Sequence, residues 1–358
     1  MERIDLKRFD NIPVYAPDTG SFAVKLDANE SFLEPDIRLR AKITEIAAGF
    51  DFKRYPDPNA TALCEAFGRL YGIDPKLLTA GNGSDELISV VIMTLLTAGQ
   101  RLLVCDPDFS MYRFYSDRAG IECLAYEKSL GYDIDVGEII TKARERLADM
   151  VIFSNPCNPT GRGVTRTEIV RLAEELSDRA VVIDEAYMDF WDQSVLDMVG
   201  KLPNLIVLRT CSKACGLAAL RVGFAAASEC VTGILHKGKS PYNVTGLSQA
   251  IACAVLDTPD YVAGCISKII EARDNLYKAL KEIEKTFGDI IVVRECRTNF
   301  VVMSSEKGRM IQEMLKKRGV SVRFTENLLR VTAGSDREHA IFLRELKNVL
   351  KELLGGNV

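Results

Sequence analysis

Short apolar runs alternate with amphipathic segments through the middle of the chain. The apolar runs cover residues 102–105, 151–153, 180–183, 205–208 and 222–226. Unbroken runs of this length are typical of strands buried on both faces, as in a parallel sheet covered by helices. Segments with helical periodicity, such as 84–96 and 166–176, separate them. This order predicts an α/β domain whose mostly parallel sheet is sandwiched by helices.

Reactive side chains follow three of these predicted strands. Asn158 lies in NPCNPTG, after the second run. Asp184 and Tyr187 lie in DEAY, after the third run, and Lys213 lies in SKACGL, after the fourth. Arg221 follows eight residues after the lysine. Ligands of open α/β sheets bind at the carboxyl ends of the strands, so we expect these side chains to share one site.

Together these groups match the needs of pyridoxal 5′-phosphate (PLP). An amine forms an imine with its aldehyde, and a carboxylate keeps the pyridine nitrogen protonated. A phenol and an amide can hydrogen-bond the ring oxygen. Taken singly, a lysine is usually a surface charge, an aspartate often caps a turn, and a tyrosine often lies in the core. As a set they predict Lys213, Asp184 and Tyr187 as catalytic residues and Asn158 as a cofactor ligand.

The cofactor phosphate requires hydroxyl, guanidinium and N–H donors. The lysine turn contains two hydroxyls, and GNGSDELI opens an amphipathic helix whose N-terminal N–H groups favour an anion. We predict the phosphate ligands Gly83, Ser84, Asp85, Thr210, Ser212 and Arg221. GNG also resembles the start of a dinucleotide fingerprint, but its third glycine is missing, which disfavours nicotinamide binding. Phe109, after the first run, either stacks on the cofactor ring or lies in the core.

Composition disfavours several other classes of function. The formal net charge of −4 provides no basic surface for nucleic acid or anionic lipid. The longest apolar stretch, near 87–98, falls short of the ~20 residues of a membrane span, and MERIDLKRFD lacks a signal-peptide core. The 10 cysteines include no CxxC pair and the chain has 2 histidines, so we expect reduced thiols, a cytoplasmic protein and no metal site.

The pattern changes after about Tyr242. The predicted elements there are a long helix over 259–286, β-like runs over 290–294 and 299–303, a helix over 309–318, strands over 320–324 and 328–332, and a final helix from Asp336. We therefore predict a large cofactor-binding domain over 36–245 and a smaller α+β domain over 246–358. Residues 1–35 are irregular and contain prolines, which favours an arm packed on the small domain.

Motifs along nearly the whole chain resemble those of histidinol-phosphate aminotransferases, within the fold type I, aspartate-aminotransferase-like superfamily. They are LDANES, RYPDPN, GNGSDELI, NPCNPTG, VIDEAY, RTCSKACGLAALRVGF, SPYNVT, RTNFVV and LLRVTAG. The resemblance implies amino transfer between histidinol phosphate and 2-oxoglutarate in histidine biosynthesis. It also implies that Lys213 acts in turn as covalent anchor, base and acid.

The resemblance assigns roles to residues outside the PLP motifs. Tyr55 would reach the cofactor phosphate of the neighbouring subunit, which implies a homodimer with shared active sites. Arg330 would bind the carboxylate of glutamate or 2-oxoglutarate, and Arg323 with Arg330 would bind the substrate phosphate. Asn29 and Tyr15 would line the substrate pocket.

The substrate remains open at the level of sequence. Aromatic-amino-acid aminotransferases and threonine-phosphate decarboxylases share much of this motif set. Aminotransferase-like ligand sensors of transcription regulators are disfavoured, because the pattern begins at LDANES and leaves no room for a DNA-binding module before it. The chain departs from the family pattern at three places. The arm reads ANES where the family usually has a proline. Phe109 stands where tyrosine is common, and Cys157 stands where asparagine is frequent.

Overall fold

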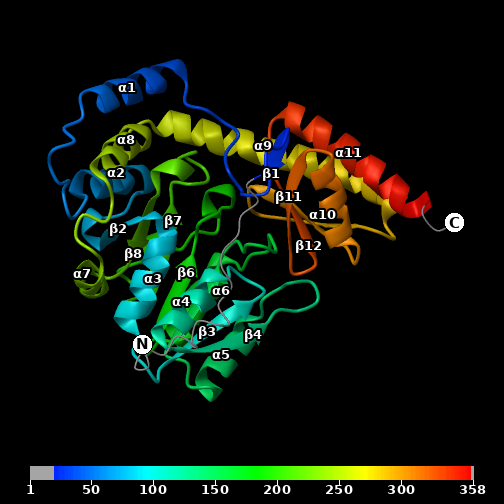
Figure 1. Cartoon of the computed structure of the whole chain (residues 1–358). Coiled ribbons are helices and arrows are strands. Elements are labelled where there is room, and N and C mark those ends of the chain that lie inside the picture. The colour runs from blue at the N-terminus through cyan, green and yellow to red at the C-terminus, as the bar shows by residue number, and fades with distance from the viewer. Residues whose placement is uncertain (1–19, 356–358) are drawn as a thin grey trace, which may run out of the picture.

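The computed structural model describes residues 20–355, which form two sheets with flanking helices (Figure 1). The larger sheet has the strand order β2-β8-β7-β6-β5-β3-β4. Its strands are β2 (Leu78–Asn82), β3 (Arg101–Asp106), β4 (Glu122–Glu127), β5 (Met150–Ser154), β6 (Ala180–Asp184), β7 (Leu205–Thr210) and β8 (Val222–Ala226). The five predicted runs correspond to β3, β5, β6, β7 and β8.

Strand β8 departs from the parallel arrangement expected for run 222–226. It pairs antiparallel with both β7 and β2, whereas the other pairs of this sheet are parallel. A parallel crossover needs a helix-length connection. The link from β7 to β8 contains only the lysine turn and the short 3₁₀ helix η5 (Ala218–Leu220), so the chain reverses direction there.

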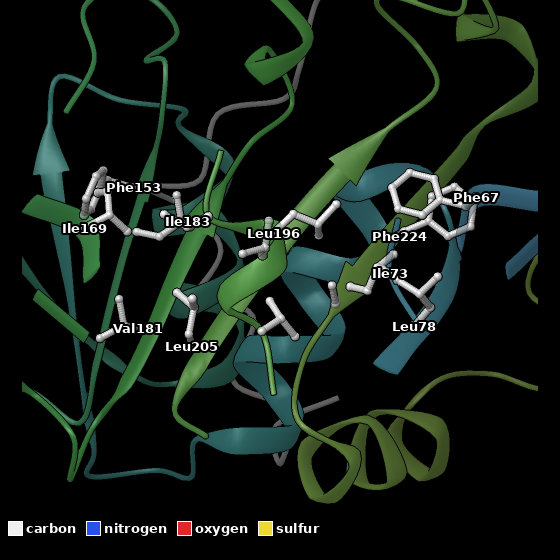
Figure 2. Packing of buried hydrophobic residues seen from close by; sticks show 14 of the residues in the cluster. Phe67, Ile73, Leu78, Phe153, Ile169, Val181, Ile183, Leu196, Leu205 and Phe224 are labelled. Atoms are coloured by element: carbon white, nitrogen blue, oxygen red, sulfur yellow. The ribbon is translucent and has the colours of Figure 1, made fainter. Parts of the chain in front are cut away.

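Helices cover both faces of this sheet. Those of the large-sheet side are α1 (Ile37–Ala48), α2 (Thr61–Tyr71), α3 (Gly83–Leu95), α4 (Met111–Ala119), α5 (Val136–Glu145), α6 (Arg166–Glu175), α7 (Glu229–Gly238) and α8 (Gly246–Leu256). Buried residues of α2, α5 and α6 form one core cluster with the sheet, and those of α3, α4 and α7 form another. Figure 2 shows part of the first cluster, in which Phe67 of α2 stacks on Phe224 of β8 with ring centroids 4.1 Å apart.

The side chains of β6 alternate between these two clusters. Val181 and Ile183 belong to the α2/α6 face, and Val182 belongs to the α3/α4 face. Alternate residues of a strand point to opposite faces. The next two residues continue the pattern, which directs Asp184 toward the α3/α4 face and Glu185 toward the α2/α6 face.

The smaller sheet has the order β1-β11-β12-β10-β9. Its elements are β1 (Val24–Leu26), β9 (Val292–Arg294), β10 (Phe300–Ser304), β11 (Val320–Thr325) and β12 (Leu328–Thr332), with helices α9 (Pro259–Phe287), α10 (Gly308–Lys317) and α11 (Asp336–Gly355). Strand β1 pairs in parallel with β11. The segment expected to be irregular thus contributes an edge strand to this sheet (Figure 1).

Helix α9 joins the two parts of the molecule. Its Val262 lies in the core of the large sheet, whereas its Leu276 and Leu280 lie in the core of the small sheet. Helix α8 packs against α1 and α2 on the large-sheet side, so the residues of the two cores meet along α9. Among the described residues no single helix has the length and apolar composition to cross a membrane; only α8 and α9 taken together would, across an 82° bend.

Candidate active site

Lys213 lies in the turn after β7, with its amine directed toward the segment that follows β1. Its Nζ donates to the carbonyl oxygen of Ala28 at 3.2 Å and lies 5.9 Å from the centroid of the Tyr187 ring. Burial, and after it the positive charges of Arg330 and Arg221, lowers the pKa of Lys213 to about 8. A lysine in this state has a sizeable fraction of neutral amine near neutral pH, which makes it a usable nucleophile and base.

Asp184 is buried on the α3/α4 face at the end of β6. Its Oδ2 accepts a hydrogen bond from the Tyr112 hydroxyl at 3.0 Å, and its Oδ1 accepts one from the Ala186 N–H at 3.0 Å. Burial raises the pKa of this carboxyl to about 7. Because both donors are neutral, a cationic group of a ligand beside Asp184 would favour its ionised form.

Tyr187 is tied to the N-terminal segment through Asn29. The Asn29 amide donates to the Tyr187 hydroxyl oxygen at 2.8 Å, and the Asn29 backbone N–H donates to Thr332 Oγ1 at 3.0 Å. Asn299 donates to the Asn29 carbonyl oxygen at 3.0 Å. Burial raises the pKa of the Tyr187 phenol, so its own proton remains available for a ligand oxygen.

The side chain of Arg330 reaches from β12 of the small sheet to the loop after β5 of the large sheet. Its Nη1 donates to Asn158 Oδ1, and its Nη2 donates to the Asp27 carbonyl oxygen at 2.6 Å. Arg323 lies directly opposite Arg330 in the β11–β12 register. Opposite residues of an antiparallel pair project from the same face, so both guanidinium groups leave the hairpin on one side.

The start of α3, the lysine turn and Arg221 form an anion cradle. Gly83 has φ of 82°, and a Cβ built there would lie 2.5 Å from Nη2 of Arg221, so the guanidinium sits directly against this glycine. Arg221 Nη1 donates to Ser212 Oγ at 3.4 Å, and Thr210 Oγ1 donates to the same oxygen at 3.0 Å. A helix N-terminus, a guanidinium and two hydroxyls in one place suit a phosphate group.

Other predicted ligands lie around this cradle. Burial raises the pKa of the Asp85 carboxyl, whose Oδ2 accepts from Tyr115 at 3.2 Å. The Ser84 nitrogen approaches β8 so closely that a Cβ on Gly223 would lie 2.3 Å from it. Phe109 meets Tyr112 edge to face, with ring centroids 5.8 Å apart.

Tyr55, which is predicted to act at the cofactor of a neighbouring subunit, lies away from the phosphate cradle of its own chain. Tyr55 is 83% exposed and stacks on Tyr242, with ring centroids 4.7 Å apart. None of its contacts within residues 20–355 is with the phosphate cradle. Tyr15 lies outside the described residues.

Sequence reasoning missed several residues that support the site. Tyr112 lies close to Phe109 in the sequence, but nothing in the sequence indicates that its hydroxyl binds Asp184. Ala28 contributes only a backbone carbonyl, which carries no side-chain signal. Thr332 lies in a recognised motif, LRVTAG, but nothing in the sequence indicates that it binds Asn29.

The donor set fits PLP. It offers an amine for the aldehyde and a buried carboxyl whose ionised form a cationic ring nitrogen would stabilise. It also offers a phenol and an amide for the ring oxygen, and a cradle for the phosphate. Lys213, Asp184, Tyr187 and Asn158 supply the first four groups. In the part of the chain that the structure describes, no three His, Cys, Asp or Glu side chains are grouped to hold a metal ion.

Comparison with known proteins agrees with the fold. Residues 23–346 match the family model of class I and II aminotransferases, and the chain belongs to this family of amino-transferring enzymes. The predicted α/β fold and enzyme class are thereby confirmed.

More specific likenesses point to one branch of the family. The chain is 39% identical over 342 residues to the histidinol-phosphate aminotransferase of Clostridium novyi (strain NT). The matched residues make up 94% of this chain and 94% of the relative. It is 35% identical over 354 residues to the enzyme of the same name from Thermoanaerobacter sp. (strain X514), covering 97% of this chain and 98% of the relative. The crystal structure of histidinol-phosphate aminotransferase from Sinorhizobium meliloti, in complex with pyridoxal-5′-phosphate, shares the fold: its TM-score is 0.88 at 22% identity, covering 99% of both chains.

Proposed function

We propose that the chain is a PLP-dependent histidinol-phosphate aminotransferase of histidine biosynthesis. It would convert histidinol phosphate and 2-oxoglutarate to imidazole-acetol phosphate and glutamate. The observation that carries the substrate assignment is the pairing of Arg323 with Arg330 across the β11–β12 hairpin, together with the reach of Arg330 to Asn158. The names of the full-length relatives support the same substrate.

The two amino compounds of this reaction need one cationic pocket. Histidinol phosphate carries a phosphate and no carboxylate, whereas glutamate carries two carboxylates. Guanidinium forks bind either anion with two parallel hydrogen bonds. Two arginines projecting from the same face of the hairpin therefore allow one pocket to serve both half-reactions.

The residues of the site divide the chemical work. PLP, when bound, supplies an electron sink for the charge left on the substrate Cα after its proton leaves. Lys213 Nζ would hold the cofactor aldehyde, and its neutral amine would take the proton from the substrate Cα. Asp184 would pair with the charge of the pyridine nitrogen, and Tyr187 with Asn158 would hydrogen-bond the ring oxygen. The cradle around Gly83 and Arg221 would hold the phosphate.

A half-reaction screen tests the substrate. Purified holoenzyme is mixed separately with histidinol phosphate, glutamate, phenylalanine, tyrosine and phosphothreonine while the cofactor absorbance is followed. We expect histidinol phosphate and glutamate to convert the cofactor fastest. Faster conversion by phenylalanine or tyrosine would establish an aromatic aminotransferase, and release of CO₂ from phosphothreonine would establish a decarboxylase.

We also infer a cytoplasmic homodimer with shared active sites. Tyr55 and Phe52, in the loop after α1, are 83% and 72% exposed, which suits a surface covered by a second copy. Tyr55 makes its aromatic contact with another partly exposed ring, Tyr242. The ten cysteines include no CxxC pair, which suits a reducing compartment.

A further inference from the structure

A buried ion cluster lies directly behind the site, on the α2/α6 side of the large sheet. Arg209 Nη1 lies 3.2 Å from Glu185 Oε2, and Arg209 Nη2 pairs with Asp189. The three side chains are 5%, 0% and 4% exposed, respectively. The Tyr71 ring lies 4.6 Å from Arg209 Cζ, and its hydroxyl donates to Asp189 Oδ1 at 3.1 Å. We call these four residues the Arg209 cluster.

Two of the three charged members of the cluster are next to a residue of the site in the sequence. Glu185 follows Asp184, and Arg209 precedes Thr210, so each pair occupies opposite faces of its strand end. The parallel ladder continues to this point, because the Glu185 N–H donates to the Leu208 carbonyl oxygen at 2.9 Å. The cluster therefore joins the ends of β6 and β7 on the α2/α6 face, opposite the site.

The third charged member extends the connection to Tyr187. Asp189 lies in the 3₁₀ helix η3 (Met188–Phe190), which begins directly after that tyrosine. Glu185 is further held by the Ser194 hydroxyl at 2.6 Å and the Val195 N–H at 2.7 Å. One guanidinium thus connects the segments that carry Asp184, Tyr187 and the lysine turn.

Stability alone does not explain charges at this place. Taking charges out of water is costly, and well-packed apolar residues of similar volume are often as stabilising as a buried ion pair. A planar guanidinium fork differs from apolar packing in that it fixes direction as well as distance. Behind a catalytic site, such fixed geometry sets how the side chains on the opposite face are placed.

We propose that Arg209 is a positioning residue for the reaction. Through Glu185 and Asp189 it fixes the ends of β6 and β7 and the turn after Tyr187, and so sets the placement of Asp184 relative to Lys213. Its effect on turnover rests on the proposed function, whereas its effect on cofactor binding does not.

The test compares Arg209→Met, Arg209→Lys and the control Arg101→Met. Arg101, at the start of β3, also forms an ion pair, with Glu122, but that pair is partly exposed and lies at the opposite end of its strand from the site. The measurements are the PLP dissociation constant of cofactor-free protein, and kcat and KM of the glutamate half-reaction, at a temperature where circular dichroism shows each variant folded.

We expect Arg209→Met to weaken PLP binding and to lower kcat by about tenfold or more, because small misplacements of reacting groups are costly. The KM for glutamate should change much less, since the β11–β12 hairpin is untouched. Arg209→Lys should recover part of the loss, and Arg101→Met should match the wild type.

A folded Arg209→Met variant with wild-type PLP affinity and kcat overturns the proposal. If that variant does not fold, Glu185→Gln replaces it, because it keeps the shape of the side chain and removes one charge; unchanged PLP affinity and kcat in this variant overturn the proposal equally. A wild-type protein that binds PLP without transaminating refutes the proposed function, while the PLP affinities of the variants still decide the role of Arg209.

Discussion

At the scale of the residue, Lys213 has an amine whose charge is disfavoured by its surroundings. In protein stripped of PLP, we expect it to react with an amine-acylating reagent with a midpoint near pH 8, well below the range of surface lysines. Replacing Arg330 with alanine removes a nearby positive charge and should move this midpoint upward. Peptide mapping across a pH series measures both values. A Lys213 midpoint equal to that of the surface lysines would contradict this account.

Asp184 should make the cofactor-free protein less stable as the pH rises. Its pKa is raised on folding to about 7, so the folded state binds more protons than the unfolded state between about pH 4 and 7. The stabilising contribution of the protonated carboxyl is complete below that window and is lost as the pH rises through 7. The Asp184→Asn variant has no such loss. Its free energy of unfolding should therefore rise relative to that of the wild type across the window, by on the order of 4 kcal/mol. Urea unfolding at several pH values provides the comparison, and a constant difference would refute the shift.

The site was predictable from sequence where one residue carries one chemical role. Lys213 and Asp184 follow apolar strands within short motifs, and the structure brings both to one end of the sheet. The contact between Arg330 and Asn158 was not predictable in the same way, because the two residues lie far apart in the sequence and on different sheets. Neither was the role of Ala28, since any residue supplies the same carbonyl.

At the scale of the element, the β11–β12 hairpin sets the geometry of Arg323 and Arg330, the two arginines proposed to bind the substrate. Its two-residue turn, Glu326-Asn327, has φ of 50° and 57°, the left-handed conformation that holds hairpin strands in tight register. Register places Arg323 opposite Arg330, so a slip of one residue would separate them onto different faces.

The two arginines of this hairpin should differ in their effects. Arg323→Ala should raise KM for histidinol phosphate more than for glutamate, whereas Arg330→Ala should lower kcat/KM in both half-reactions. The loss of a charged hydrogen bond of about 1.5–3 kcal/mol corresponds to roughly 10–100-fold. Steady-state kinetics with each donor checks this, with Arg294→Ala on the far edge of the same sheet as the matched control. Equal losses for both donors in Arg323→Ala would remove its assignment to the phosphate.

Where the apolar residues of an element follow one clear period, the bounds of that element were predicted to within a residue or two. The run at 222–226 and the strand at 328–332 match β8 and β12, and the helix from Pro259 matches α9. Strand β4 was missed because ECLAYE alternates exposed and buried residues at the edge of the sheet. Strand β1 is only three residues long, and its partner β11 lies near the other end of the chain. The direction of β8 depends on the connection before it, which apolar periodicity does not report.

At the scale of the whole molecule, we expect the active unit to be a dimer. Lys213→Ala and Tyr55→Ala subunits should each be weakly active alone and should recover activity when mixed, because one site of each heterodimer then has both residues intact. The assay is the glutamate half-reaction after the subunits have exchanged, and Lys213→Ala mixed with itself is the control. A fully active species that sediments as a monomer would exclude shared sites.

The pairing of β1 with β11 has a consequence for how the protein folds while the ribosome synthesises it. Val24 leaves the ribosome early, yet its partner Val320 is synthesised near the end of the chain. At about 5–20 residues per second, this strand waits on the order of tens of seconds without its partner. An unpaired strand is a template for association with other chains. A nascent chain of this enzyme therefore has a defined interval in which a chaperone would be most useful, and that interval closes when β11 emerges.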